Sequence, residues 1–218
     1  MSQNLGPIHY WIYDQVKLAE GRGDMLVESL EVALGESARE AWREIARRHP
    51  GRFLEKTLEE SLDGAAIHQG LEGMIATVQI REAELAAWAR GQSAAWDPLR
   101  DAYSAHAAGW GLSVKAAAEP KDAPTIFAGF RELWLEGMPC DIRFEIREEE
   151  ADRVRWAVPE LVLPRYWRGS GCRDEDMLDL HAAWIAAFAN AAAEEFMAGL
   201  RPTFGADGIR CEFEITRK

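Results

Sequence analysis

The stretch LDGAAIHQGLEGMIATVQIREAELAAW, residues 62–88, decides the fold expected for the first half of this chain. Its aliphatic residues recur three or four positions apart, as on the buried face of an amphipathic helix: Leu71, Ile75, Val78 and Leu85. His68 and Glu82 fall on the same face. Because an unpaired buried polar group costs on the order of a few kcal/mol, each must be hydrogen-bonded, ion-paired or bound to a ligand. We therefore expect this face to border a polar pocket.

The helical pattern around this stretch runs from Phe53 to Arg90. A continuous helix of that length would measure about 57 Å, whereas a compact domain of this size should be about 45 Å across. Asp63 and Gly64 are therefore expected to break it, with Asp63 capping the second segment. His68 would then lie in the second turn of that helix.

Three further helices are expected before residue 119. One follows Gly6-Pro7 over residues 8–17, and a second runs over 24–48 with a kink near Gly35. A third lies in the stretch 96–115 and is expected to stop at the glycines of this stretch, 109 and 111. The segment AAAEPKDAP after them has the composition of a linker. We place a boundary there, between a helical half (1–118) and a second half (119–218) that together form one compact unit.

The second half is predicted to be α+β. After a helix over 124–135, apolar and charged residues alternate over 140–147, 153–158 and 209–215, as in antiparallel strands, with EEEAD as the turn of a hairpin. A long helix over 174–200 should cover the apolar face of this small sheet. The other face carries arginines and glutamates that can pair across strands. The helical N-terminal half is expected to pack on this sheet.

Charge and composition exclude several classes of protein. The net charge of -12 and the pI near 4.9 disfavour a nucleic-acid partner. We expect no membrane partner, because no signal-like N-terminus and no apolar run long enough for a bilayer occurs. Three cysteines far apart indicate free thiols. These features predict a cytoplasmic protein, and they leave open whether it is a monomer or a homo-oligomer.

His68 and Glu72 are four residues apart, so both can reach one metal ion from adjacent helical turns. With His9 from the first helix, they form our candidate site for a divalent transition metal. The alternative is that each histidine is a core residue bonded to a backbone carbonyl.

Cys172 is the candidate nucleophile. It follows two glycines in RGSGC, lies near Arg165 and Arg168, and immediately precedes a predicted helix. Such surroundings lower the pKa of a thiol and suit a small anion. The alternative is that this segment is only a surface loop.

Nine tryptophans either fill the core or line a ligand cavity. The candidate ligand-binding residues are Trp11, Tyr13, Arg165, Trp167 and Arg168.

The order Cys172-x-Asp174, a helix, and then LRPTFGADGIRCEFEI resembles the C-terminal pattern of the L-2-amino-thiazoline-4-carboxylic acid hydrolase-like proteins. The matching positions are Arg201, Thr203, Asp207, Gly208, Cys211 and Phe213. The 4-vinyl reductase type of ligand-binding domain ends in a similar strand. This resemblance covers about the last fifty residues and implies ring-opening hydrolysis of a small carboxylate near Cys172. GPIHYW and GMPCD are similar to stretches of a bacterial family to which we attach no activity.

The sequence thus favours a protein that binds a small anion or carboxylate in a pocket between its halves, with metal-assisted or cysteine-dependent hydrolysis as the activity to test. One alternative is a non-enzymatic carrier or sensor of a metal or a tetrapyrrole-type cofactor. Another is a helical interaction protein without a ligand.

Overall fold

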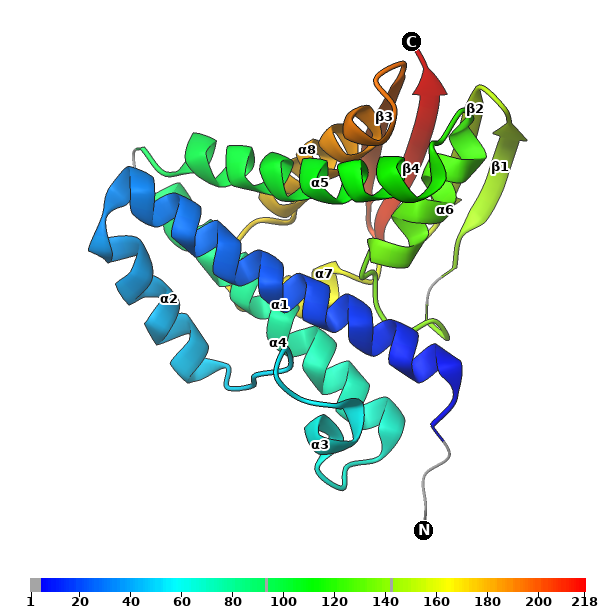
Figure 1. Cartoon of the computed structure of the whole chain (residues 1–218). Coiled ribbons are helices and arrows are strands. Elements are labelled where there is room, and N and C mark those ends of the chain that lie inside the picture. The colour runs from blue at the N-terminus through cyan, green and yellow to red at the C-terminus, as the bar shows by residue number, and fades with distance from the viewer. Residues whose placement is uncertain (1–4, 93, 142) are drawn as a thin grey trace. The chain divides into compact units, whose positions relative to one another are not determined.

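The computed structural model describes residues 5–92, 94–141 and 143–218 and confirms the α+β class (Figure 1). Its helices and strands form two compact units whose segments alternate along the chain. Unit 1 comprises Met1–Leu99, Leu133–Asp141 and Val162–Arg173. Unit 2 comprises Arg100–Glu132, Ile142–Leu161 and Asp174–Lys218. The predicted division at residue 118 stays a prediction. In the described residues, no helix is long and apolar enough to span a bilayer.

Unit 1 is helical. It contains α1 (Pro7–Leu34), α2 (Glu36–Arg48), α3 (Leu58–Leu62), α4 (Ile67–Gly91), the first residues of α5 (Trp96–Ala118) and the short α7 (Pro164–Trp167). Two helices were expected over 8–17 and 24–48, but α1 runs without a break from Pro7 to Leu34. The division from α2 falls at Gly35, whose φ of 71° ends α1. Helix α1 continues through Gly23, where Trp42 of α2 packs so closely that a Cβ would lie 2.8 Å from its ring.

The predicted break at Asp63 and Gly64 is confirmed, with φ values of 45° and 80°. Asp63 ends α3, however, and does not cap α4, which begins at Ile67 after Ala66. Consequently His68 lies in the first turn of α4, not the second. Its side chain is exposed, so the expectation that it belongs to the buried face is wrong.

Glu82, in contrast, is buried as predicted and is paired. Arg22 of α1 donates from Nε and Nη2 to its two carboxylate oxygens, each at 2.9 Å. A second buried pair joins Arg81 of α4 to Glu20 of α1 at 3.5 Å. Two ion pairs therefore connect α1 and α4 inside unit 1.

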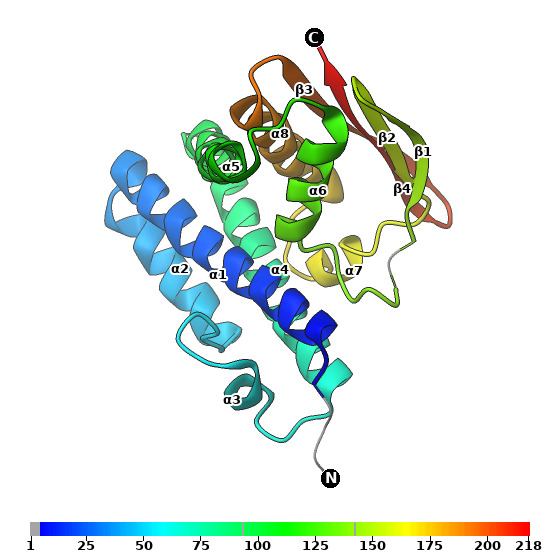
Figure 2. The ribbon, with the colours of Figure 1, turned by 45° about the vertical axis from the view of Figure 1, so that its right-hand side comes forward.

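Unit 2 contains a four-stranded antiparallel sheet in the order β1-β2-β4-β3. The strands are β1 (Glu145–Glu150), β2 (Arg153–Val158), β3 (Phe196–Gly205) and β4 (Gly208–Arg217). Helices α6 (Ala123–Leu133) and α8 (Asp174–Ala192) lie on one face of the sheet (Figure 2). An aromatic core fills this layer: Trp156 stacks on Phe213 at 5.0 Å between ring centroids, and Trp184 stacks on Phe188 at 5.4 Å. The helix-covered apolar face was predicted correctly.

The predicted pairing of charges on the open face of the sheet is confirmed around Glu214. Arg153 donates to this carboxylate at 2.8 Å, and Arg155 and Arg201 lie 3.5 and 3.8 Å from it. The strand limits differ from the prediction. The glutamates of EEEAD belong to β1, which turns only at residues 151–152. Phe144 and Ile146, expected on the apolar face, are 37% and 44% exposed, and a bulge between Ile146 and Glu148 interrupts the register of β1 with β2.

Two helix ends were also predicted wrongly. Helix α8 stops at Ala192, and residues 196–200 begin β3, which pairs along its whole length with β4. Helix α5 continues through Gly109 and Gly111 to Ala118. Gly111 permits contact between two helices here: a Cβ would lie 2.4 Å from the Phe188 carbonyl oxygen of α8.

Candidate functional site

All residues that the sequence singled out as site residues fall in unit 1. His9 of α1 and His68 of α4 approach each other, with ring centroids 5.9 Å apart. His9 Nδ1 accepts a hydrogen bond of 2.9 Å from the Gly6 N–H, which leaves Nε2 directed elsewhere. The expected convergence of two imidazoles from separate helices is therefore present, on the surface side of α4.

Glu72 has other partners. Arg165 Nη2 donates to Glu72 Oε1 (2.9 Å), to Asp141 Oδ2 (2.7 Å) and to the Tyr166 hydroxyl oxygen (2.8 Å), while that hydroxyl donates to Glu72 Oε2 (3.0 Å). We call these four residues the Arg165 cluster. Among the described residues, no three His, Cys, Asp or Glu side chains gather closely enough to hold a metal ion, and His9, His68 and Glu72 are no exception.

The surroundings in the Arg165 cluster favour the charged forms of Arg165 and Asp141 and the protonated form of Tyr166. Although burial works against it, hydrogen bonds with Tyr166 and Asp141 raise the pKa of Arg165. Burial raises the pKa of Tyr166, and the hydrogen bond from Arg165 lowers the pKa of Asp141. Burial and then Asp141 raise the pKa of the neighbouring Cys140 thiol. Arg165 thus already serves two carboxylates, and its expected role in binding a ligand stays a prediction.

The other predicted residues have different surroundings, and none of the contacts described next joins one of them to another. Cys172 is half-buried, and its thiol donates to the Arg173 carbonyl oxygen at 3.5 Å. Trp167 is buried and donates to Gln79 Oε1 at 3.0 Å, as a core residue of unit 1. Arg168 is exposed, and within the described chain it makes no ion pair. Trp11 is half-buried on α1.

Tyr13 has the most definite structural role of the predicted residues. Its buried hydroxyl lies 2.9 Å from the Phe53 carbonyl oxygen, 3.0 Å from that of Lys56 and 2.6 Å from Ser61 Oγ. Glu20 accepts the N–H groups of Phe53 and Leu54 at 2.7 Å, and Arg81 donates to the Gly51 carbonyl at 2.7 Å. Buried side chains of α1 and α4 thus clamp the segment over residues 49–61, which comprises the loop after α2 and the first residues of α3 and is called the loop over residues 49–61.

This clamped loop and α4 line an open hollow of about 550 Å³, here called the α4 pocket. Its lining residues are Pro50, Gly51, Arg52, Phe53, Lys56, Glu60, Ser61, Asp63, Gly70, Gly73, Met74 and Thr77. The sequence reasoning missed this pocket. A signal was present in the two glycines within the predicted helix, whose missing side chains give the loop space.

The two glycines play different parts. Gly70 lets α4 approach α3, because a Cβ there would lie 2.4 Å from Leu62 Cδ2. Gly73 has no atom within 4 Å of its Cβ direction, so it opens the pocket without serving any packing contact. Since glycine within a helix costs about 1 kcal/mol relative to alanine, the open space at Gly73 comes at a cost in stability.

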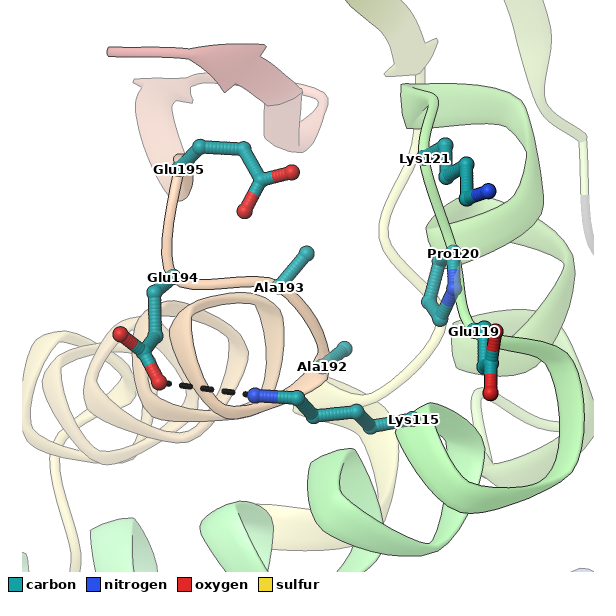
Figure 3. A pocket seen from close by; sticks show the side chains of 8 residues that line it. All are labelled: Lys115, Glu119, Pro120, Lys121, Ala192, Ala193, Glu194 and Glu195. Carbon is teal, nitrogen blue, oxygen red and sulfur yellow. Dashed lines mark hydrogen bonds and ion pairs between the residues drawn. The ribbon is translucent and has the colours of Figure 1, made fainter.

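Unit 2 has a hollow of about 480 Å³ at the ends of α5 and α8. Figure 3 shows Lys121 and Glu195 on opposite sides of it, and Lys115 reaching Glu194. Most of its charges are already paired: Lys115 with Glu194 at 3.4 Å, and Glu195 with Arg217 at 3.7 Å. A ligand would have to displace these ion pairs, so the α4 pocket is the stronger candidate.

Comparison with known proteins adds little to this geometry. No protein-family model and no curated protein matches the sequence. The crystal structure of an Fe(II) unliganded H-NOX protein mutant from K. algicida aligns with 93% of this chain and 96% of its own, with 9% identity and a TM-score of 0.42. Likeness at this level assigns neither a ligand nor a function to the chain.

Proposed function

We propose that the protein binds a small molecule bearing an anionic group, without covalent chemistry, in the α4 pocket. The observation that carries this proposal is the loop over residues 49–61, which buried side chains hold open above a glycine-containing face of α4. A pocket of about 550 Å³ lies within the range typical of small-molecule sites. Preformed walls lower the entropic cost of binding.

The charges in the α4 pocket favour an anion. Lys56 has no ion-pair partner among the described residues, and Arg52 has only the exposed Glu55, at 3.6 Å. Glu60 also lines the pocket, but its carboxylate already accepts the Thr57 N–H at 2.8 Å in a capping box. Lys56 and Arg52 therefore keep donors for a ligand, whereas one of the two lining carboxylates, that of Glu60, is already hydrogen-bonded, and Gly73 leaves space for the ligand.

The surroundings support binding more than catalysis. Neither a histidine nor a cysteine lines the α4 pocket, and a hydrolase would require an activated nucleophile or a general base near the ligand. Cysteine-dependent hydrolysis at Cys172 stays a prediction.

The test is isothermal titration of the full chain with inorganic phosphate, succinate and a sugar phosphate. At least one should bind. We expect Lys56→Gln to weaken that binding about tenfold, the effect of losing about 1.4 kcal/mol, and Gly73→Leu to abolish it by filling the space. Lys121→Gln, which removes the same charge outside the α4 pocket, is the matched control. Equal affinity of Lys56→Gln and wild type would contradict the proposal.

The pair His9 and His68 supports a second candidate, the carrier of a metal or a tetrapyrrole-type cofactor. Two imidazoles 5.9 Å apart between centroids could ligate a metal together with ligands from a cofactor or solvent, provided that His9 gives up the hydrogen bond that its Nδ1 accepts from the Gly6 N–H, because an imidazole that accepts at Nδ1 carries its proton on Nε2. Elemental analysis and the visible absorption spectrum of the purified protein test it. Metal or colour that survives His68→Ala would exclude this pair as its site.

A further inference from the structure

Unit 2 has another hollow besides the one at the ends of α5 and α8. It measures about 310 Å³ and lies at the closed end of the β3–β4 hairpin, and we call it the hairpin pocket. Gly205 pairs with Gly208 across this end, and Gly208 has a φ of 135° that favours glycine. The segment after β2 forms the other wall. It is fixed to β4 by a hydrogen bond of 2.7 Å from the Leu161 N–H to the Ile209 carbonyl oxygen.

Four charged side chains line the hairpin pocket: Arg143, Glu160, Asp207 and Arg210. Within the described residues, none of the four makes an ion pair or a side-chain hydrogen bond. This is unusual for the chain, in which most arginines lie beside a carboxylate or over an aromatic ring. The two guanidinium and two carboxylate groups are exposed to solvent and line one open hollow, with no ion pair between them.

We infer that the hairpin pocket binds a small dipolar ion, an α-amino acid or a close analogue carrying both an ammonium and a carboxylate. Arginine binds a carboxylate through two parallel N–H groups, so Arg143 and Arg210 would hold the carboxylate. Glu160 and Asp207 would accept from the ammonium. Both charges of such a ligand find partners that the protein leaves unpaired, and Thr203 adds a hydroxyl to the wall.

The balance of charge selects this class over a simple anion or cation. The two arginines and two acids of the hairpin pocket cancel, so the pocket matches a ligand that carries one charge of each sign. The volume, at the small end of ligand pockets, agrees with a single amino acid better than with a peptide.

The test is a titration of the isotope-labelled full chain with each of the common L-amino acids, following the backbone amide signals of Gly205 and Gly208. At least one amino acid should shift them saturably. Its N-acetyl derivative, which lacks the ammonium, and its amide, which lacks the carboxylate, should each bind about tenfold more weakly or not at all.

Arg210→Met and Glu160→Gln should each weaken binding by a similar factor, whereas Arg201→Met, on the same hairpin but outside the pocket, should leave it unchanged. No binding by any amino acid would overturn the inference. So would equal binding of the N-acetyl derivative, which indicates a plain anion site, or of the amide, which indicates a cation site. The α4 pocket lies in unit 1, so its test and this one fail independently.

Discussion

Glu82 and Arg22 form an ion pair whose side chains are only 1% and 6% exposed. Removing one member of such a pair leaves an uncompensated charge in the interior, which typically costs about 3–5 kcal/mol. We therefore expect Arg22→Met to lower the free energy of unfolding by that amount. The double variant Arg22→Met with Glu82→Leu should recover most of the loss, because neither charge of this pair is then left in the interior without the other. Urea denaturation of the three variants and wild type measures both effects, and a double variant no more stable than Arg22→Met would contradict this account.

Tyr166 should make the folding stability of the protein depend on pH in the alkaline range. Burial raises its pKa above the value of about 10 for an unfolded chain. The folded state therefore holds the proton more tightly, and this contribution to stability is intact below about pH 10 and is lost as the pH rises towards the folded pKa. Tyr166→Phe should cost about 1.5–3 kcal/mol at neutral pH, since it removes hydrogen bonds to charged groups.

Above about pH 10 the two stability curves should converge, because only the wild type has the tyrosine proton to lose. Urea midpoints measured across this range provide the test. A difference between the two proteins that stays constant with pH would show that Tyr166 does not titrate as its burial implies.

At the same scale, the sequence could show which side chains need partners but not always which partners they have. Glu82 was expected to be paired because a carboxylate recurred on an aliphatic face, and it is. Its partner Arg22 is sixty positions away, and no local pattern links them. Glu72 was assigned to a metal because His68 stands one turn away, but Arg165 from a distant segment reaches it first.

Within helix α5, two glycines distinguish the effect of helix propensity on stability from the effect of packing against a neighbouring helix. Gly111→Ala would place a Cβ 2.4 Å from the Phe188 carbonyl oxygen and 2.8 Å from Ala191 Cβ. Overpacking of this kind costs about 1–3 kcal/mol. Gly109→Ala, two positions earlier, meets nothing within 4 Å and should stabilise the helix by up to about 1 kcal/mol. Thermal unfolding followed by circular dichroism should move in opposite directions for the two variants, and equal shifts would disprove the proposed contact.

The errors in element limits share one physical cause. Gly109 and Gly111 were taken as a helix end because glycine is a helix breaker, yet close contact with a neighbouring helix also demands glycine. The turn between α8 and residues 196–200 consists of Glu194 and Glu195, without proline or glycine, so the helical pattern continues in the sequence although residues 196–200 pair with β4 as a strand. The break at Asp63 and Gly64 was predictable because both adopt positive φ locally, without help from distant segments.

For the molecule as a whole, contacts between segments distant in the sequence determine the features that could not be predicted, above all the pockets. Each unit gathers three separate segments of the chain, and both candidate pockets lie in loops or hairpin ends within a unit. The α+β class followed from periodicity alone, since a repeat of two and a repeat near 3.6 are visible in single segments. Pockets depend on what a loop is clamped to, and the residues that clamp the loop at 49–61 come from α1 and α4.

Overall charge predicts that the protein will not bind nucleic acid. Acidic residues number 37 against 25 basic ones, and the arginines on the open face of the sheet surround Glu214 instead of forming a basic stripe. In a gel-shift assay at low salt, wild type should not retard duplex DNA. Replacing Glu148 and Glu214 by glutamine would release Arg153, Arg155 and Arg201. That variant should retard DNA weakly, and less as salt is added, because phosphate binding releases counterions. Retardation by the wild type would show that a basic surface forms despite the negative total, and would reopen the class of partners.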